Sequence, residues 1–142
     1  EMAERIVEEP VSLVNENGAP AGEKHFLFYN PPVVNAELGI RESAVKVTSR
    51  IATQLFSRDI QSIVFARSRL RVEILTTYLR EAVAKMKKDV RKVQGYRGGY
   101  LPTERRAIEK GLRDGAILTV ISTNALELGI DIGALDVCVM CG

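Results

Sequence analysis

Apolar residues in this 142-residue chain follow two patterns, short continuous runs that alternate with longer amphipathic stretches. The clearest amphipathic stretch is 70–86, where apolar side chains keep one helical face throughout, which predicts a helix. Weaker helical patterns cover 42–56 and 103–114, the latter with Thr103 as a candidate N-cap and Gly115 at its end. Short apolar runs bounded by polar residues predict strands at 61–66, 116–122 and 135–140, and the mixed stretch 90–96 predicts a half-exposed strand.

The predicted strands and helices alternate along the chain, and this order favours one architecture. Right-handed crossovers of this length place successive strands parallel in one sheet, with helices on its faces. We therefore expect a three-layer α/β domain with a mostly parallel central sheet. Ligands of such sheets gather at the carboxyl ends of the strands, so the loops that follow the strands are the candidate binding segments.

The first 32 residues show a different pattern. A short helical stretch comes first, and two runs with strand propensity, 11–14 and 25–29, then flank an Asn-Gly turn signal at 17–18. Two consecutive prolines follow, and proline has no amide hydrogen to donate to a sheet. We expect an N-terminal segment with a β-hairpin at 1–32 and the α/β domain at 33–142.

Composition narrows the class of protein. With 46% hydrophobic and 27% charged residues, the chain has the make-up of a folded globular protein. No apolar run approaches the ~20 residues of a membrane span, and the N-terminus is acidic where a secretory signal would be basic. We therefore expect a cytoplasmic protein with no membrane partner.

The two cysteines, Cys138 and Cys141, have a C-x-x-C spacing. A zinc site would need two more ligands, and the single histidine, His25, is distant in sequence. A redox pair would normally open a helix, whereas this pair lies in a predicted strand. We expect two unbridged thiols in a buried strand and no metal site, while a redox role in a longer protein stays open.

The net charge of +2 hides an uneven distribution. Residues 67–106 contain twelve Lys or Arg and four acidic residues, a balance of +8, and the remainder of the chain has a balance of −6. Such a concentration of positive charge favours polyanions, because each neutralised phosphate releases condensed counterions. A solvated helix face is the other interpretation of the same residues.

Three segments that follow predicted strands carry groups suited to a phosphate backbone. Residues 67–69 place two arginines around a serine at the start of a helix, where free amides and the helix dipole also attract anions. Residues 96–100 combine an arginine, two glycines and two tyrosines. Residues 122–124 offer two hydroxyls and an amide, which contact phosphate without reading bases. Each is also typical of a helix cap or turn, so their shared position is the stronger signal.

A fourth feature follows at Gly129 and Asp131. The glycine permits a tight backbone path, and the aspartate lies between two isoleucines that fix its carboxylate. A fixed carboxylate near a strand end suits a ribose hydroxyl or an arginine. A turn glycine with a capping aspartate is the alternative.

The stretches SIVFARSRLRVEIL, GYRGGYLPTERRAIEKGLRDG and LTVISTNALELGIDIGALD resemble motifs IV, IVa and V of the second RecA-like domain of superfamily 2 helicases. They are most similar to the DEAD/DEAH-box DNA helicases of the YprA-like group, and the N-terminal hairpin residues also resemble that domain. The resemblance implies contacts with the backbone of single-stranded DNA, or of RNA. The residues implied are Ser68, Arg69, Arg97, Gly98, Thr123 and Asn124, with Arg105 supporting the loop at 97–98.

The same resemblance implies that Gly129 and Asp131 face a cleft where ATP sits between this domain and an N-terminal RecA-like domain of the same chain, with Asp131 near the ribose or the arginines of motif VI. It also implies magnesium, shared with that first domain. The sequence has no G-x-x-x-x-G-K-[ST] phosphate loop and no acidic D-E-A-D or D-E-x-H box. The arginine-rich motif VI, which would follow Gly142, is absent too. We therefore expect part of an ATP-dependent helicase that does not hydrolyse ATP by itself. A non-catalytic regulatory α/β domain with a basic, protein-binding surface is the alternative.

Overall fold

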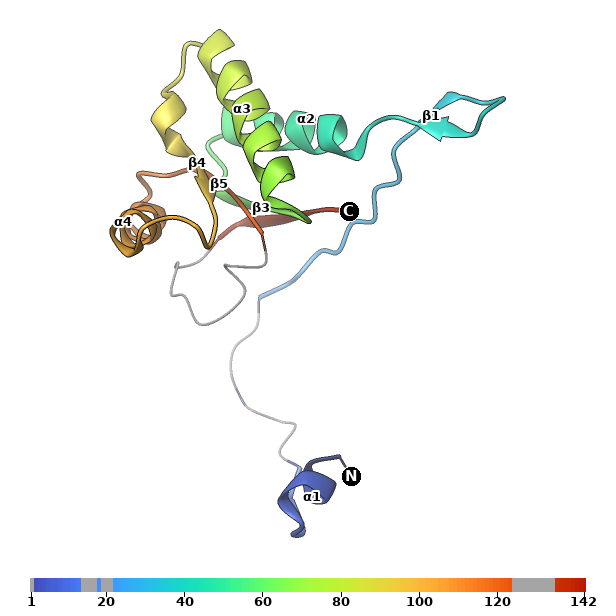
Figure 1. The fold of residues 1–142 in the computed structure, drawn as a ribbon, viewed down its shortest axis with the longest axis vertical. Helices are drawn as coiled ribbons and strands as arrows, with labels where there is room; N and C mark the ends of the chain where they lie inside the picture. The colour runs from blue at the N-terminus through green and yellow to red at the C-terminus, as the bar shows by residue number, and fades with distance from the viewer. Residues whose placement is uncertain (1, 14–17, 19–21, 124–134) are drawn as a thin grey trace.

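The computed structural model describes residues 2–13, 18, 22–123 and 135–142. Four parallel strands form the central sheet, in the order β4-β5-β3-β6 (Figure 1). Non-consecutive neighbours in this order require crossover connections, as the alternating pattern predicts. The strands are β3 Ser62–Ala66, β4 Val93–Tyr96, β5 Thr119–Ser122 and β6 Val137–Cys141.

Helices cover the two faces of this sheet, so the domain has the expected three layers. Helices α2 (Ala44–Ser57) and α3 (Arg69–Lys85) pack on one face, where Phe56, Leu79 and Val64 are buried together. Helix α4 (Pro102–Arg113) packs on the other face (Figure 1). There Leu112 of the helix meets residues of β4 and β5 such as Val120. Strands β3, β4 and β5 are mostly buried, because helices cover both of their faces.

The predicted helix at 70–86 is confirmed within one residue at each end. Its start is fixed by Ser68, whose hydroxyl oxygen accepts a hydrogen bond from the Arg71 amide at 3.3 Å. The N-cap predicted at Thr103 is wrong, because α4 begins one residue earlier at Pro102, whose fixed φ suits the first helical position. The Leu101 amide at this start donates to the Glu104 carboxylate at 3.0 Å.

Two strand predictions differ in detail from the structure. The segment predicted as a strand at 90–96 opens with a short 3-10 helix, η1 (Val90–Lys92), and becomes a strand only at Val93. The carboxylate of Asp89 stabilises this turn by accepting from the Arg91 amide at 2.9 Å. Strand β5 begins at Thr119, three residues later than predicted. No helix of the described residues combines the length and the apolar character that a membrane crossing requires.

An N-terminal antiparallel hairpin is present, but other residues form it. Strands β1 (Val33–Asn35) and β2 (Ile40–Arg41) pair across a turn that contains Gly39 at φ +63°. The described parts of the two expected strands, 11–13 and 25–29, form no strand. No sheet edge of the described residues pairs with them, and Phe28 is 98% exposed. The boundary between 1–32 and 33–142 stays a prediction.

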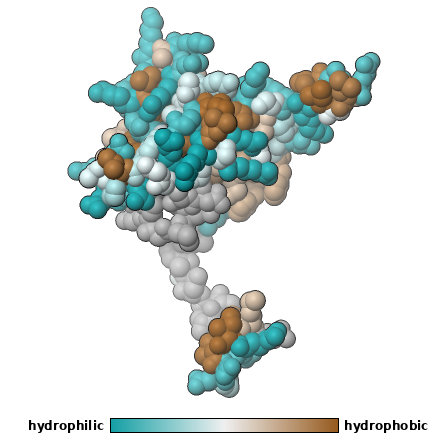
Figure 2. Space-filling model, in the orientation of Figure 1, coloured by the Kyte–Doolittle hydropathy of each residue, from teal (hydrophilic) through white to brown (hydrophobic). Residues whose placement is uncertain are grey.

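This hairpin stands away from the body of the domain, as the ribbon shows (Figure 1). Its apolar side chains Val34 and Leu38 are 64% and 71% exposed, and the projecting hairpin carries a hydrophobic patch on the face shown in Figure 2. Within the turn, the Asn35 side chain accepts from the Leu38 amide at 2.9 Å. The hairpin is therefore held by its own turn and not by burial against the sheet.

Both cysteines are free, as expected, but only one is in the core. Residues three apart on a strand point to opposite faces, so Cys138 and Cys141 of β6 cannot form a disulfide with each other there. Cys141 is buried against α2 and α3. The prediction of a second core thiol is wrong, because Cys138 pairs in register with Ile63 on the opposite face and is exposed at the edge of the sheet.

Candidate nucleic-acid interface

The parallel register brings three of the predicted binding segments together at the carboxyl ends of the strands. Ser122 at the end of β5 lies opposite both Phe65 of β3 and Tyr96 of β4. The chain therefore leaves these three neighbouring strands at the same level. We call this end of the sheet the carboxyl rim and define it by residues 67–69, 97–99 and 123. It contains five of the predicted binding residues, which come from three segments that are distant in sequence: Ser68, Arg69, Arg97, Gly98 and Thr123.

The segment that follows β3 combines the start of α3 with three arginines, Arg67, Arg69 and Arg71. Ser68 caps α3 through its oxygen, so its hydroxyl hydrogen remains available to donate to an anion. Arg69 is the first residue of α3 and is exposed. Arg71 donates from Nη1 to the Gly142 carbonyl at 3.2 Å, at the end of the neighbouring strand β6. The amides of this 17-residue helix add a partial positive charge at the same place.

The exit of β4 holds Arg97 between two neighbours. Its Nη1 lies 3.4 Å from Glu73 Oε1 of α3, and its Cζ lies 5.1 Å from the centre of the Tyr100 ring. Its Nε is buried and makes no hydrogen bond with any described residue. Gly98 is open, since a Cβ there would meet no described atom within 4 Å. A ligand could therefore approach the backbone of this loop.

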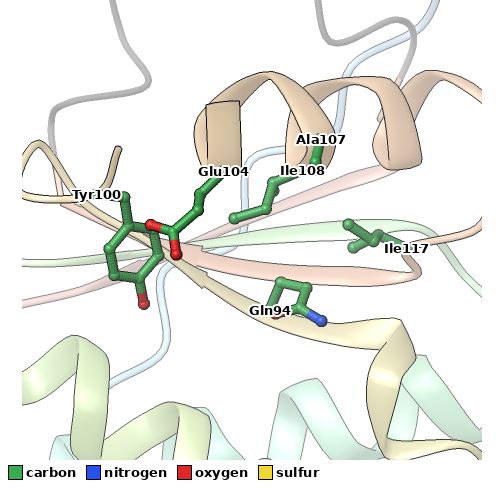
Figure 3. A pocket seen from close by; sticks show the side chains of 6 residues that line it. All are labelled: Gln94, Tyr100, Glu104, Ala107, Ile108 and Ile117. Atoms are coloured by element: carbon green, nitrogen blue, oxygen red, sulfur yellow. The ribbon is translucent and has the colours of Figure 1, made fainter. Parts of the chain in front are cut away.

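Tyr100 reaches this position because residue 95 has no side chain. A Cβ at Gly95 would lie 3.3 Å from the Tyr100 hydroxyl and 3.2 Å from Thr76 Oγ1 of α3. The Tyr100 ring also lines a pocket of about 530 Å³ between β4 and α4, where Glu104 and Ile108 line it as well (Figure 3). Tyr100 thus forms part of the pocket wall, and it also packs against the Arg97 guanidinium, whose Cζ lies 5.1 Å from the ring centre.

After β5, the structure describes the chain only as far as Thr123 before residue 135. Ser122 is fully buried and donates from its hydroxyl to the Thr123 carbonyl at 2.6 Å. Thr123 is half-buried at the rim. The predicted residues Asn124, Gly129 and Asp131 lie outside the described residues, so the proposed nucleotide side of this loop stays a prediction.

Arg105 lies on the first turns of α4, beside the residue that precedes the loop at 97–99. Tyr96 is 1% exposed, and its hydroxyl donates to Glu109 Oε1 at 2.8 Å. Burial and this carboxylate raise the pKa of Tyr96 to about 12, and the nearby Arg105 opposes that shift. Tyr96 thus remains a protonated donor that ties the end of β4 to α4. Arg105 lies close to the Tyr96 hydroxyl, and its role as a support of the loop stays a prediction.

The basic stretch 67–106 does not form one surface. Helix α3 runs away from the rim, and its far end, η1 and the start of β4 lie at the amino ends of the strands (Figure 1). Cations at that opposite end have local partners: Arg91 pairs with Asp89 at 2.9 Å and Lys88 with Asp59 at 3.4 Å. The excess positive charge is therefore divided between the rim and the opposite end. Sequence distance alone could not separate the two groups.

Glu73 of α3 contacts the rim residue Arg97, and the sequence interpretation missed it. The sequence does mark Glu73 as unusual, because it is one of four acidic residues among the twelve basic ones within 67–106. Its contact with Arg97 depends on how α3 packs against β4, which no local pattern predicts. The described residues contain no group of three or more His, Cys, Asp or Glu side chains that could hold a metal ion.

Comparison with known proteins gives the family of this arrangement. The helicase conserved C-terminal domain family matches residues 46–142. The uncharacterized ATP-dependent helicase YprA of Bacillus subtilis is 55% identical over 144 residues, covering 100% of this chain and 19% of that protein. The ATP-dependent helicase HRQ1 of Saccharomyces cerevisiae is 40% identical over 134 residues, covering 93% of this chain and 12% of that protein.

Solved structures agree with this family. The helicase MrfA bound to DNA and AMPPNP superposes with a TM-score of 0.88 at 54% identity, over 100% of this chain and 19% of that one. The Mycobacterium smegmatis helicase Lhr bound to ssDNA and AMP-PNP has a TM-score of 0.63 at 28% identity, over 78% of this chain and 14% of that one. The chain thus spans about a fifth, or less, of the length of these relatives.

Proposed function

The chain belongs to the family of helicase conserved C-terminal domains, and from this premise we propose that it is the second motor domain of a longer ATP-dependent helicase. In that protein it would grip one nucleic-acid strand by its phosphates and complete an ATP cleft with a first RecA-like domain. The observation that carries the proposal is the meeting of residues 67–69, 97–99 and 123 at the carboxyl rim.

The rim offers the donors that a phosphate backbone needs. Arg69 and Arg97 supply guanidinium groups, which form strong charge-assisted hydrogen bonds with phosphate. Ser68 and Thr123 supply hydroxyls, and the open backbone at Gly98 supplies an amide. None of these groups reads a base edge, so the grip would be independent of sequence. Asn124 would extend the same contact, and Arg105 would hold the loop in place from behind.

The nucleotide part of the proposal rests on other residues. The sequence has no phosphate loop, and the described residues do not fit a magnesium–ATP site by themselves. Gly129 and Asp131 would be this chain's contribution to ATP, and the first RecA-like domain would supply the cradle for the triphosphate and the magnesium ligands. ATP supplies the energy for movement in such a protein. The residues described here bind and orient the strand.

The strand would be single-stranded DNA. Two relatives of known structure, MrfA and Lhr, were solved with DNA and with ssDNA. RNA is the alternative substrate, since phosphate contacts do not distinguish the two. The family match over residues 46–142 does not favour a non-catalytic regulatory domain, although the exposed basic residues would suit such a role.

Salt dependence of binding tests this proposal. If the 142-residue chain uses two or three phosphate contacts on a single-stranded oligonucleotide, the logarithm of affinity falls with a slope of about −0.7 per contact. Affinity then drops roughly tenfold between 50 and 200 mM salt. Fluorescence anisotropy with labelled oligo-dT and a mixed-sequence oligonucleotide measures both slopes, with an RNA of equal length in parallel. Equal affinity at the two salt concentrations would rule out a phosphate grip.

A further inference from the structure

Glu73 is the acidic residue that faces the rim. Of the four acidic residues within 67–106, it is the one that the described ion pairs connect to a rim cation, through the 3.4 Å contact with Arg97. Asp89 pairs instead with Arg91 at the opposite end of β4, and Glu104 accepts from the Leu101 amide just before α4. A carboxylate next to a phosphate-binding arginine opposes the binding of an anion, so its position calls for a physical reason.

The surroundings of Arg97 limit where a phosphate could bind it. One face of the guanidinium rests over the Tyr100 ring, and the Nε is buried. The contacts therefore leave the Nη atoms as the exposed donors, and Nη1 already lies beside Glu73. A phosphate that approaches these donors meets the carboxylate at the same site. The two anions then compete for one cation.

The exposure of the pair decides the outcome of this competition. The side chains of Arg97 and Glu73 are 37% and 47% exposed, so solvent screens their attraction. Arginine forms charge-assisted, bidentate pairs with carboxylate and with phosphate alike, but the Arg97–Glu73 contact of 3.4 Å is longer than the roughly 2.7–2.9 Å of a strong charge-assisted hydrogen bond, so a phosphate can make the better contact. A strand can therefore displace Glu73. When the strand leaves, the ion pair forms again without rearrangement of the backbone.

We propose that Glu73 competes with the nucleic-acid phosphate for Arg97 and thereby limits how tightly the carboxyl rim holds a strand. The inference rests on the proposed function and assigns a release role to one residue of the same site. A motor domain must let go of its strand in every cycle, and a built-in competing anion lowers the barrier to release. Glu73 is a positioning residue in this account, since it acts through Arg97.

The test compares Glu73→Gln with unaltered full-length protein in binding to a labelled single-stranded oligonucleotide. Loss of the competing charge is expected to tighten binding roughly threefold, the size of one exposed ion pair. The slope of affinity against salt should become steeper, because the freed cation neutralises phosphate more fully. The matched control is Glu81→Gln, the same charge change two turns further along α3, and it should leave affinity unchanged.

The Arg97→Ala background separates the two levels of the proposal. Glu73→Gln added to Arg97→Ala should have no effect on affinity, because Glu73 acts only through that arginine. If Arg97→Ala itself leaves binding unchanged, the proposed grip at Arg97 is wrong. If Arg97→Ala weakens binding but Glu73→Gln weakens it too or changes nothing, only the competition is overturned. In that case Glu73 merely orients the guanidinium or has no part in binding.

Discussion

Replacing Arg97 by alanine in the full-length protein is expected to raise the single-stranded DNA concentration for half-maximal ATPase stimulation about tenfold or more. Hydrogen bonds to charged groups contribute about 1.5–3 kcal/mol each, and about 1.4 kcal/mol corresponds to a factor of ten. Steady-state ATPase rates over a DNA titration measure the effect, and the rate without DNA should change little.

The matched control is Arg91→Ala. Arg91 flanks the other end of β4, its side chain is 86% exposed, and it also pairs with a carboxylate, that of Asp89. The two variants thus remove the same charge from the two ends of β4. Arg91→Ala should leave the DNA dependence within about twofold of the unaltered protein, since exposed ion pairs contribute little. Equal losses in both variants would mean that net charge, and not the rim, binds DNA.

Phe56→Ala is expected to lower the free energy of unfolding of the chain by about 3–5 kcal/mol. Phe56 is 1% exposed and belongs to the core between α2, α3 and the sheet, and Lys88 Nζ lies 5.8 Å from its ring centre. Removing the ring leaves a cavity and loses this cation–π contact. The loss is a large part of the about 5–15 kcal/mol that stabilises a typical domain. Denaturant unfolding followed by circular dichroism measures it.

Phe28→Ala provides the comparison with the same chemical change. Phe28 is 98% exposed in the segment that precedes the β1–β2 hairpin, so its replacement should alter the unfolding free energy by less than about 0.5 kcal/mol. If it destabilised the chain as much as Phe56→Ala, the N-terminal segment would pack against the domain. The description of that segment as separate from the core would then be wrong.

The sequence predicted the α/β domain because its signals are strong and local. Helix α3 carries one apolar face and a serine cap, and the strands after it are apolar runs between polar residues. The shared position of residues 67–69, 97–99 and 123 needed only the rule that parallel strands end at one edge. No knowledge of side-chain contacts was required for that step.

Features that depend on tertiary neighbours could not be predicted in the same way. The hairpin was expected at an Asn-Gly signal, but a pairing partner and a turn at Gly39 decided its position. The exposure of Cys138 follows from the place of β6 at the edge of the sheet, which the order of strands in sequence does not give. Likewise, the pair between Glu73 and Arg97 joins residues that are close only once α3 packs on β4.

The central claim is that a strand lies along the carboxyl rim, and hydrogen–deuterium exchange of the full-length protein with and without single-stranded DNA tests it most directly. One experiment then measures amide exchange at both ends of β4 and β5. We expect protection of amides at 67–69, 97–99 and 123, with no change at 90–93 and 117–119, the amino ends of β4 and β5. Protection at those amino ends with an unchanged rim would contradict the account.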